Sequence, residues 1–302
     1  MADQASRLRE LAAAYRARAA EPAPRRRTRV IAVTSGKGGV GKTNLSINLA
    51  QVLIASGKDV ILLDADLGLA NAHVLLGSVP PYHMGHLLRG EQDIVGLIHT
   101  TPSRLKLIAG GYAVEELVDL TPAQLNRFVV ALSELDGRAD YLFVDTGAGV
   151  NHVVLSFVLA ADEVLLVTTP EPTALADAYA TIKILHRRNP QIQIRLIINQ
   201  AQDFREGREA AQRLVATARS FLGLEVQILG TVPRDPCVWQ AVRAGRPFVE
   251  AYPLSPASRA VRAMGKVLLV ESMAPADAGE KAEAAPTGFF QRLARLLVRR
   301  EQ

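Results

Sequence analysis

A glycine-rich segment near the start of the chain carries the residue types that bind a chain of phosphates. Residues 36–43 read GKGGVGKT and match the pattern G-x-x-x-x-G-K-[ST], in which successive backbone N–H groups wrap phosphate oxygens. Lys42 would place its charge against the β- and γ-phosphates, and the hydroxyl of Thr43 is a suitable Mg²⁺ ligand. The segment therefore predicts a site for a nucleotide with its Mg²⁺. The residues expected to contact the nucleotide are Gly36, Lys37, Gly38, Gly39, Val40, Gly41, Lys42 and Thr43.

Three aspartates follow runs of apolar residues and could complete this site. Asp64 and Asp66 stand at the end of VILLDAD, and Asp145 ends YLFVD. Ligands of open parallel sheets bind at the carboxyl ends of the strands, so these acids can face the metal and the phosphates. Asp64 and Asp145 are metal candidates, and one acid of the first pair could orient or deprotonate an attacking water. The alternative for the first pair is a solvated turn.

A second group of polar residues could form the pocket for the nucleotide base. Asn199 follows the apolar run RLII, and Pro233 and Asp235 follow VQILGTV. The amide of an asparagine offers both a donor and an acceptor, which suits a purine edge. An asparagine at a strand end is also a common turn residue, so its type and position leave both interpretations open.

These residues must be positioned by strands that alternate with helices. Buried strands are expected at residues 30–33, 59–64, 140–145, 163–169, 195–199 and 226–232, and within the segment 105–111. Helical patterns lie between several of these runs, beginning with the one that opens at Thr43. Such alternation predicts an α/β fold with a doubly wound, mostly parallel sheet flanked by helices, and helical extensions at both ends.

Composition limits the class of protein. The chain has 302 residues, 49% hydrophobic and 22% charged, which is enough for one large α/β domain. One cysteine, Cys237, excludes an internal disulfide framework, and we expect a cytoplasmic protein without a signal peptide or a spanning helix. The net charge of +5 comes from arginine clusters near the two ends, but no nucleic-acid motif accompanies them, so no specific nucleic acid is expected.

The N-terminal extension is expected to form a helix over residues 1–20, followed by a linker at 21–28. Leu8, Leu11 and Tyr15 make a narrow apolar stripe. The stripe fits equally a helix packed on its own domain and a detachable helix that enters a partner's groove.

The C-terminal extension is expected to follow the ATPase domain of residues 29–271. Residues 272–287 read as a flexible linker of small and charged residues, and residues 288–302 as an amphipathic helix. Arginines stand opposite the apolar face, which favours binding to an anionic membrane surface over packing on protein. The residues expected to enter the membrane are Phe289, Phe290, Leu293, Leu296 and Leu297.

The chain resembles the MinD/ParA family of deviant Walker A ATPases over about residues 28–270. The resemblance lies in the segments SGKGGVGKTNLSINLA, LLDADLGLANAHVLLG, LFVDTGAGV, TTPEPTALADAYA, IINQAQ and GTVPRDPCVWQAVRAGRPF. It implies weak ATP hydrolysis and an ATP-dependent homodimer in which Lys37 reaches the partner's phosphates. It also implies that Asp66 positions the attacking water and that Lys42 takes part in catalysis. Asp64 and Asp145 would lie near the metal, and a pocket would hold the base. His73 stands where the family often has an acid.

Within this family the segments most resemble the regulators of flagellar number and placement, the FlhG, FleN or YlxH branch. That resemblance implies reversible attachment to the inner face of the cell membrane and stimulation of an FlhF-like GTPase. Flagellar switch proteins or a transcription regulator are further partners of the kind it implies. The residues expected to contact the GTPase are Asp3, Gln4, Leu8 and Arg9.

Three other functions are compatible with the same motifs. A ParA-type DNA-partitioning or cargo-positioning ATPase would bind DNA through basic surface. An iron–sulfur scaffold is disfavoured, because a dimer with one cysteine per chain has two thiolates and not the usual four. A regulator that binds ATP without hydrolysing it would show no phosphate release.

Overall fold

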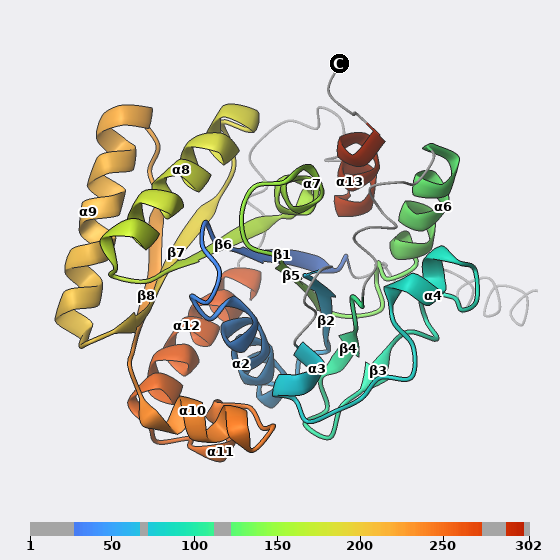
Figure 1. Cartoon of the computed structure of the whole chain (residues 1–302), viewed down its shortest axis with the longest axis horizontal. Coiled ribbons are helices and arrows are strands. Elements are labelled where there is room, and N and C mark those ends of the chain that lie inside the picture. The colour runs from blue at the N-terminus through green and yellow to red at the C-terminus, as the bar shows by residue number, and fades with distance from the viewer. Residues whose placement is uncertain (1–26, 67–71, 112–121, 274–287, 299–302) are drawn as a thin grey trace, which may run out of the picture.

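The computed structural model describes residues 27–66, 72–111, 122–273 and 288–298 (Figure 1). In this part of the chain eight strands form one sheet in the order β3-β4-β2-β5-β1-β6-β7-β8, parallel except for β3. The expected α/β fold with a mostly parallel sheet is therefore confirmed. The strands are β1 (Arg29–Thr34), β2 (Val60–Ala65), β3 (His99–Thr100), β4 (Lys106–Ile108), β5 (Tyr141–Thr146), β6 (Glu163–Thr168), β7 (Ile194–Ala201) and β8 (Gln227–Pro233).

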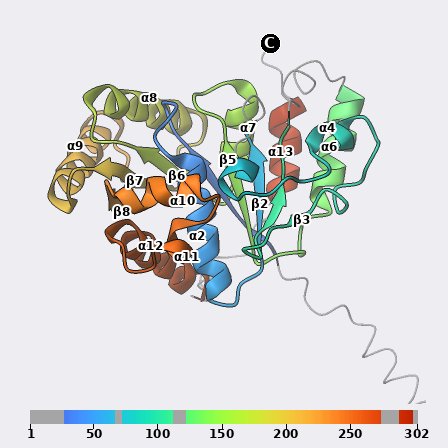
Figure 2. The same cartoon turned by 60° about the horizontal axis from the view of Figure 1, so that its bottom comes forward.

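Helices cover both faces of the sheet (Figures 1 and 2). Helices α2 and α12 pack on one face, and α6, α7, α8, α9 and α13 on the other. The helices are α2 (Lys42–Ala55), α3 (Ala72–Leu75), α4 (Met84–Leu88), α6 (Pro122–Ser133), α7 (His152–Ala160), α8 (Pro172–Arg188), α9 (Phe204–Leu222), α10 (Pro236–Arg243), α11 (Phe248–Ala251), α12 (Pro256–Met273) and α13 (Phe289–Val298).

Strand β1 lies in the middle of the sheet, and its register fixes where the motifs meet. It pairs with β5 through Val33 and Asp145, and β5 pairs with β2 through Asp145 and Asp64. The strands β1, β2, β5 and β6 are apolar and almost fully buried, as expected for a parallel sheet covered on both faces. The carboxyl ends of these strands thus bring the P-loop and the aspartates to one edge of the sheet.

The amphipathic helix expected at the C-terminus is present as α13, and its apolar face packs on the domain. Phe289, Phe290, Leu293 and Leu297 are buried in the same core as residues of α6 and α7. Leu296 is partly buried against that core. The face that we expected to contact a membrane is therefore covered by the protein itself in this structure.

Polar contacts also hold α13 in place. Arg292 donates to the carbonyl oxygen of Ala160 at 2.8 Å and to Oδ1 of Asp162 at 2.6 Å. The same Asp162 oxygen accepts from Arg27 at 2.7 Å, and Oδ2 accepts from the backbone amide of Val30 at 3.0 Å. One carboxylate therefore joins α13, the start of β6 and the chain just before β1.

Candidate nucleotide site

The phosphate loop lies between β1 and α2, and its backbone requires glycine at two positions. Gly39 and Gly41 have φ angles of 77° and 92°, in the left-handed region. A side chain at Gly41 would also meet the amide nitrogen of Asn199 at 2.4 Å. Gly41 gives no side-chain cap to α2, and the first turn of α2 contains no acid, so its amides and its dipole are suited to an anion.

Asp145 is the residue best suited to a role near Mg²⁺. It is fully buried, and its Oδ1 accepts from the hydroxyl of Ser46 at 3.0 Å, while Oδ2 has no hydrogen-bond partner among the described residues. Burial raises the pKa of Asp145 to about 6, opposed by the Thr43 hydroxyl and by Lys42. A cation beside Thr43 and Asp145 would remove the cost of this buried charge, so these two residues fit the ion.

Asp64 is also buried, but both of its oxygens are used by the backbone. Oδ1 accepts from the amide of Asp66 and Oδ2 from the amide of Ala72, each at 3.1 Å. Burial, followed by the neighbouring charge of Asp145, raises the pKa of Asp64 to about 8. Asp64 thus joins the end of β2 at Asp66 to the start of α3 at Ala72, in addition to its predicted place near the metal.

The part of the chain that the structure describes contains no cluster of three His, Cys, Asp or Glu side chains arranged to hold a metal ion.

Asp66 lies beside the loop that follows β5. A Cβ built at Gly147 would stand 3.2 Å from Oδ1 of Asp66. Ala65 pairs with Thr146 in the sheet, and this pairing sets the distance between the two loops. Asp66 therefore lies at the edge where the phosphates would end, as a water-orienting acid requires.

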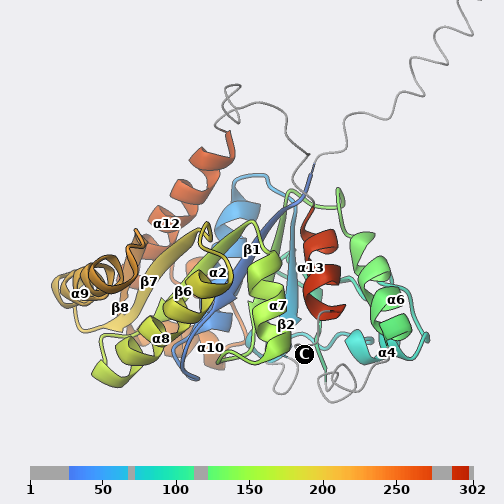
Figure 3. The same ribbon diagram turned by 90° about the horizontal axis from the view of Figure 1, so that it is seen from above.

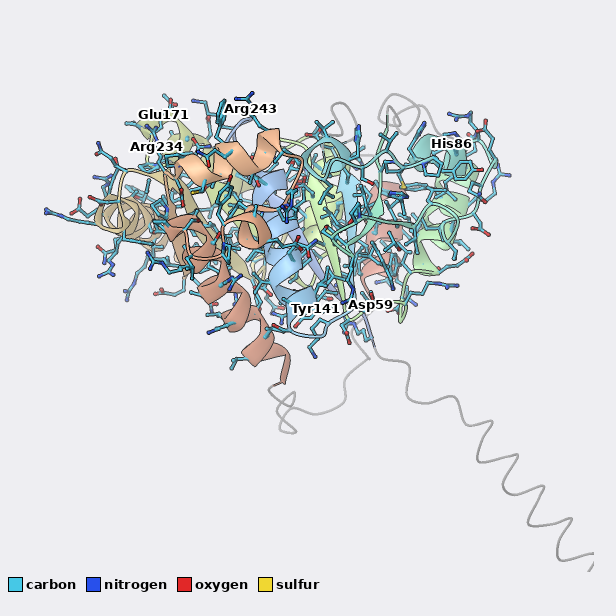
Figure 4. The ribbon with its side chains drawn as sticks, turned by 90° about the horizontal axis from the view of Figure 1, so that it is seen from below. Asp59, His86, Tyr141, Glu171, Arg234 and Arg243 are labelled. Carbon is cyan, nitrogen blue, oxygen red and sulfur yellow. The ribbon has the colours of Figure 1, made fainter. Side chains whose placement is uncertain are left out.

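The side chain of Lys37 contacts residues at the start of α8. Its Nζ lies 2.9 and 3.1 Å from the two carboxylate oxygens of Glu171, and 2.9 Å from the hydroxyl of Thr173. Hydrogen bonds from Thr173 and then Lys37 lower the pKa of Glu171. Figure 4 shows Glu171 and Arg234 at one edge of the molecule, with Asp59 and Tyr141 at the opposite edge. The second lysine is thus held at the nucleotide edge by a residue just before α8.

The predicted base residues lie together in a cavity of about 520 Å³ beside Gly41. The amide of Asn199 donates to the carbonyl oxygen of Val40 at 2.8 Å, so one of its N–H groups is used within the protein. Pro233 forms part of the wall. The cavity is lined by Gly41, Asn44, Leu45, Asn199, Gln200, Val232, Pro233, Arg234, Asp235, Pro236, Val238, Trp239, Val242 and Phe248.

The structure gives Asp235 a structural role that differs from the predicted contact with the base. Its Oδ1 accepts from the amide of Cys237 at 2.9 Å and caps α10, and its Oδ2 accepts from the amide of Ala257 at 3.0 Å. The carboxylate is therefore used to join α10 to α12. Asp235 lines the cavity but shapes it mainly through these contacts.

Gln200 and Trp239 also line this cavity and were not among the residues predicted to contact the nucleotide, although Trp239 could be expected from the sequence to pack in the core or to form a pocket wall. Gln200 has a φ of 57° and donates from its side-chain amide to the carbonyl oxygen of Gly39 at 3.2 Å. Trp239 is 61% exposed, and the guanidinium of Arg243 lies 4.7 Å from its ring centre. Asp235, Trp239 and Val242 are spaced so that they share one face of α10, and this spacing could have indicated that Trp239 lines the same cavity as Asp235.

The residues predicted to contact a GTPase cannot be placed on the domain. Asp3, Gln4, Leu8 and Arg9 lie outside the described residues, as does most of the predicted linker at 272–287. None of the described helices is long and apolar enough to cross a membrane.

Comparison with known proteins places this geometry in a family. Residues 26–269 match the ParA family, described as NUBPL iron-transfer P-loop NTPase. The chain is 41% identical over 237 residues to the antiactivator FleN of Pseudomonas aeruginosa, covering 78% of this chain and 85% of that protein. It is 35% identical over 272 residues to the flagellum site-determining protein YlxH of Helicobacter pylori, covering 89% and 91% of the two chains.

A solved structure agrees with the sequence matches. The septum site-determining protein MinD of Pyrococcus horikoshii, complexed with Mg-ADP, superposes with a TM-score of 0.67 at 27% identity. The match covers 80% of this chain and 96% of that one.

Proposed function

The chain belongs to the MinD/ParA family of P-loop ATPases, and we propose that it is an ATP-controlled dimerising switch that regulates flagellar number and placement. The observation that carries the proposal is the position of Lys37, whose Nζ is held by Glu171 and Thr173 at the nucleotide edge. A lysine in this position is suited to the phosphates of a second subunit. The similarity to FleN and YlxH supports the flagellar role.

ATP binding follows from the P-loop, the orphan amides of α2 and the cavity beside them. The charge of Lys42 and the amides of α2 hold the phosphates, and Thr43 with Asp145 would hold Mg²⁺, which neutralises phosphate charge when it is bound. The amide nitrogen of Asn199 is engaged with Val40, and we expect its oxygen to contact the base. An acceptor there suits the amino group of adenine.

Hydrolysis is assigned to Asp66, which would orient the attacking water. We expect Asp66→Ala to bind ATP and to dimerise, but to release phosphate at least 100-fold more slowly, since general bases contribute about 10²–10⁴-fold. Phosphate release and size-exclusion chromatography with ATP would be measured on the same samples. Asp59→Ala is the matched control, because Asp59 is an exposed acid paired with Lys106 at the opposite edge (Figure 4). Wild-type turnover in Asp66→Ala would refute the assignment.

Membrane attachment would use α13 after it leaves the domain. The helix presents four buried apolar side chains on one face, and the same face would bind a membrane once exposed. One short amphipathic helix binds weakly, so two helices in an ATP-bound dimer would bind the inner face of the cell membrane more strongly than one. Hydrolysis and separation of the dimer would then return the helices to the domain.

Regulation of an FlhF-like GTPase is assigned to residues 1–20. A synthetic peptide of this segment should stimulate GTP hydrolysis by such a GTPase from the same cell. Gln4→Ala or Leu8→Ala should weaken this stimulation without changing the ATPase rate of the full chain. An inert peptide, together with a lower melting temperature of the Leu8→Ala protein, would instead indicate a helix packed on its own domain.

A further inference from the structure

A second cavity, of about 320 Å³, lies between α13 and the ends of α7 and α8, separate from the nucleotide site. Helix α7 lies between α8 and α13 (Figures 1 and 3). Because α7 and α8 end just before β6 and β7 begin, the cavity lies toward the edge of the sheet opposite the P-loop. Its lining residues are Leu159, Arg188, Asn189, Arg292, Arg295 and Leu296.

The charged residues that line this cavity are all positive. Three of its six lining residues are arginines, and none is an acid. Asp162, which accepts from Arg292 and from Arg27, does not line the cavity. Arginine side chains gathered on one concave surface concentrate a positive potential there.

The side chains around the cavity have the chemistry of a phosphate site. A guanidinium group presents paired N–H donors that match phosphate oxygens, and the amide of Asn189 can add a further donor. Leu159 and Leu296 give the wall an apolar part that suits the carbon portion of an organic phosphate. We propose that this cavity binds a phosphate-bearing anion, whether a soluble phosphate compound or the phosphate of an anionic lipid.

Such an anion would connect α13 to the domain. Arg292 and Arg295 belong to α13, whereas Arg188 belongs to the last turn of α8. The complete cavity exists when α13 is packed on the domain, so its ligand stabilises the packed position by mass action. If α13 also carries the proposed membrane attachment, the ligand opposes release of the helix. The binding itself does not depend on that function.

The test uses the full-length protein saturated with ADP and Mg²⁺, so that the P-loop is filled. Inorganic phosphate and, separately, dihexanoyl phosphatidylglycerol below its micelle concentration are titrated by calorimetry at constant ionic strength. Hydrogen exchange of residues 288–298 is followed in the same samples. The variants are Arg188→Gln and Arg295→Gln, and the matched control is Arg187→Gln, an exposed neighbour of Arg188 that does not line the cavity.

We expect wild type and Arg187→Gln to bind with equal affinity and to protect residues 288–298. Arg188→Gln and Arg295→Gln should each bind at least fivefold more weakly, with correspondingly less protection. Binding of both probes indicates recognition of the shared phosphate, and binding of one identifies the source as soluble or lipid. The proposal is overturned if neither probe binds, or if all four proteins bind with equal affinity. The proposed membrane function is tested separately, by vesicle binding.

Discussion

Asp162→Asn should release α13 without altering the helix itself. The substitution removes the charge that Arg292 contacts at 2.6 Å but keeps an oxygen that can accept from the Val30 amide. A charge-assisted hydrogen bond is worth about 1.5–3 kcal/mol. The side chains of Arg292 and Asp162 are 26% and 22% exposed, so solvent screening reduces the effect to about 1–2 kcal/mol. The packed position of α13 should weaken by about 5- to 30-fold.

Two measurements on full-length protein test this prediction. Hydrogen exchange of residues 288–298 should accelerate by about 5- to 30-fold, and sedimentation with vesicles containing phosphatidylglycerol should increase in the absence of ATP. Arg27→Gln is the control, because it removes the other arginine on the same carboxylate and keeps the Asp162–Arg292 ion pair.

Hydrogen exchange and vesicle sedimentation test two separate claims. Unchanged exchange in Asp162→Asn would refute the role of the Asp162–Arg292 ion pair in holding α13. Faster exchange without increased vesicle binding would refute the proposal that the exposed face of α13 binds a membrane. A rise in vesicle binding of equal size in Arg27→Gln, which lowers the net charge where Asp162→Asn raises it, would indicate that general loosening around Asp162, and not loss of its ion pair with Arg292, explains the result.

Three other predictions concern the nucleotide site. Asp145→Asn should raise the free energy of unfolding of the nucleotide-free protein by up to about 3 kcal/mol at pH 7, because a pKa raised from 3.8 to about 6 means that the buried charge lowers stability by that amount. Chemical denaturation would check this. The variant should also lose the further stabilisation that ATP with Mg²⁺ gives to the wild type. Glu171→Gln should free Lys37 and slightly strengthen the ATP-dependent dimer, because an ion pair between exposed side chains is weak; weaker dimerisation in analytical ultracentrifugation would contradict this. The fluorescence of Trp239, the single tryptophan of the chain, should change on ATP binding in wild type, and an unchanged spectrum would place the base elsewhere.

The central strands and the P-loop could be predicted from the sequence because their signals are local. Four or more consecutive apolar residues ending in Asp64 or Asp145 identify buried parallel strands, and the glycine spacing identifies the loop between them. Strand β3 was not predicted, since a strand of two residues, His99–Thr100, is too short to show any periodicity. Its position depends on pairing with β4.

The partners of individual polar side chains could not be predicted in the same way. Asp235 reads equally well as a base contact or as a helix cap, and its bonds to Cys237 and Ala257 depend on how α12 returns to α10. The contact between Lys37 and Glu171 joins residues 134 positions apart. A hydrogen bond depends on distance and angle, which a sequence pattern does not specify for residues so far apart.

The sequence determined that the chain has a P-loop, a parallel sheet and an amphipathic helix at its C-terminal end, because each of these follows from the order of neighbouring residues. The tertiary structure decided what covers the apolar face of that helix. Burial of apolar surface is favourable against protein or lipid and has no direction, so periodicity alone does not distinguish the two. The positions of α6 and α7 and the carboxylate of Asp162 bring Leu293 and its neighbours into the core of the domain.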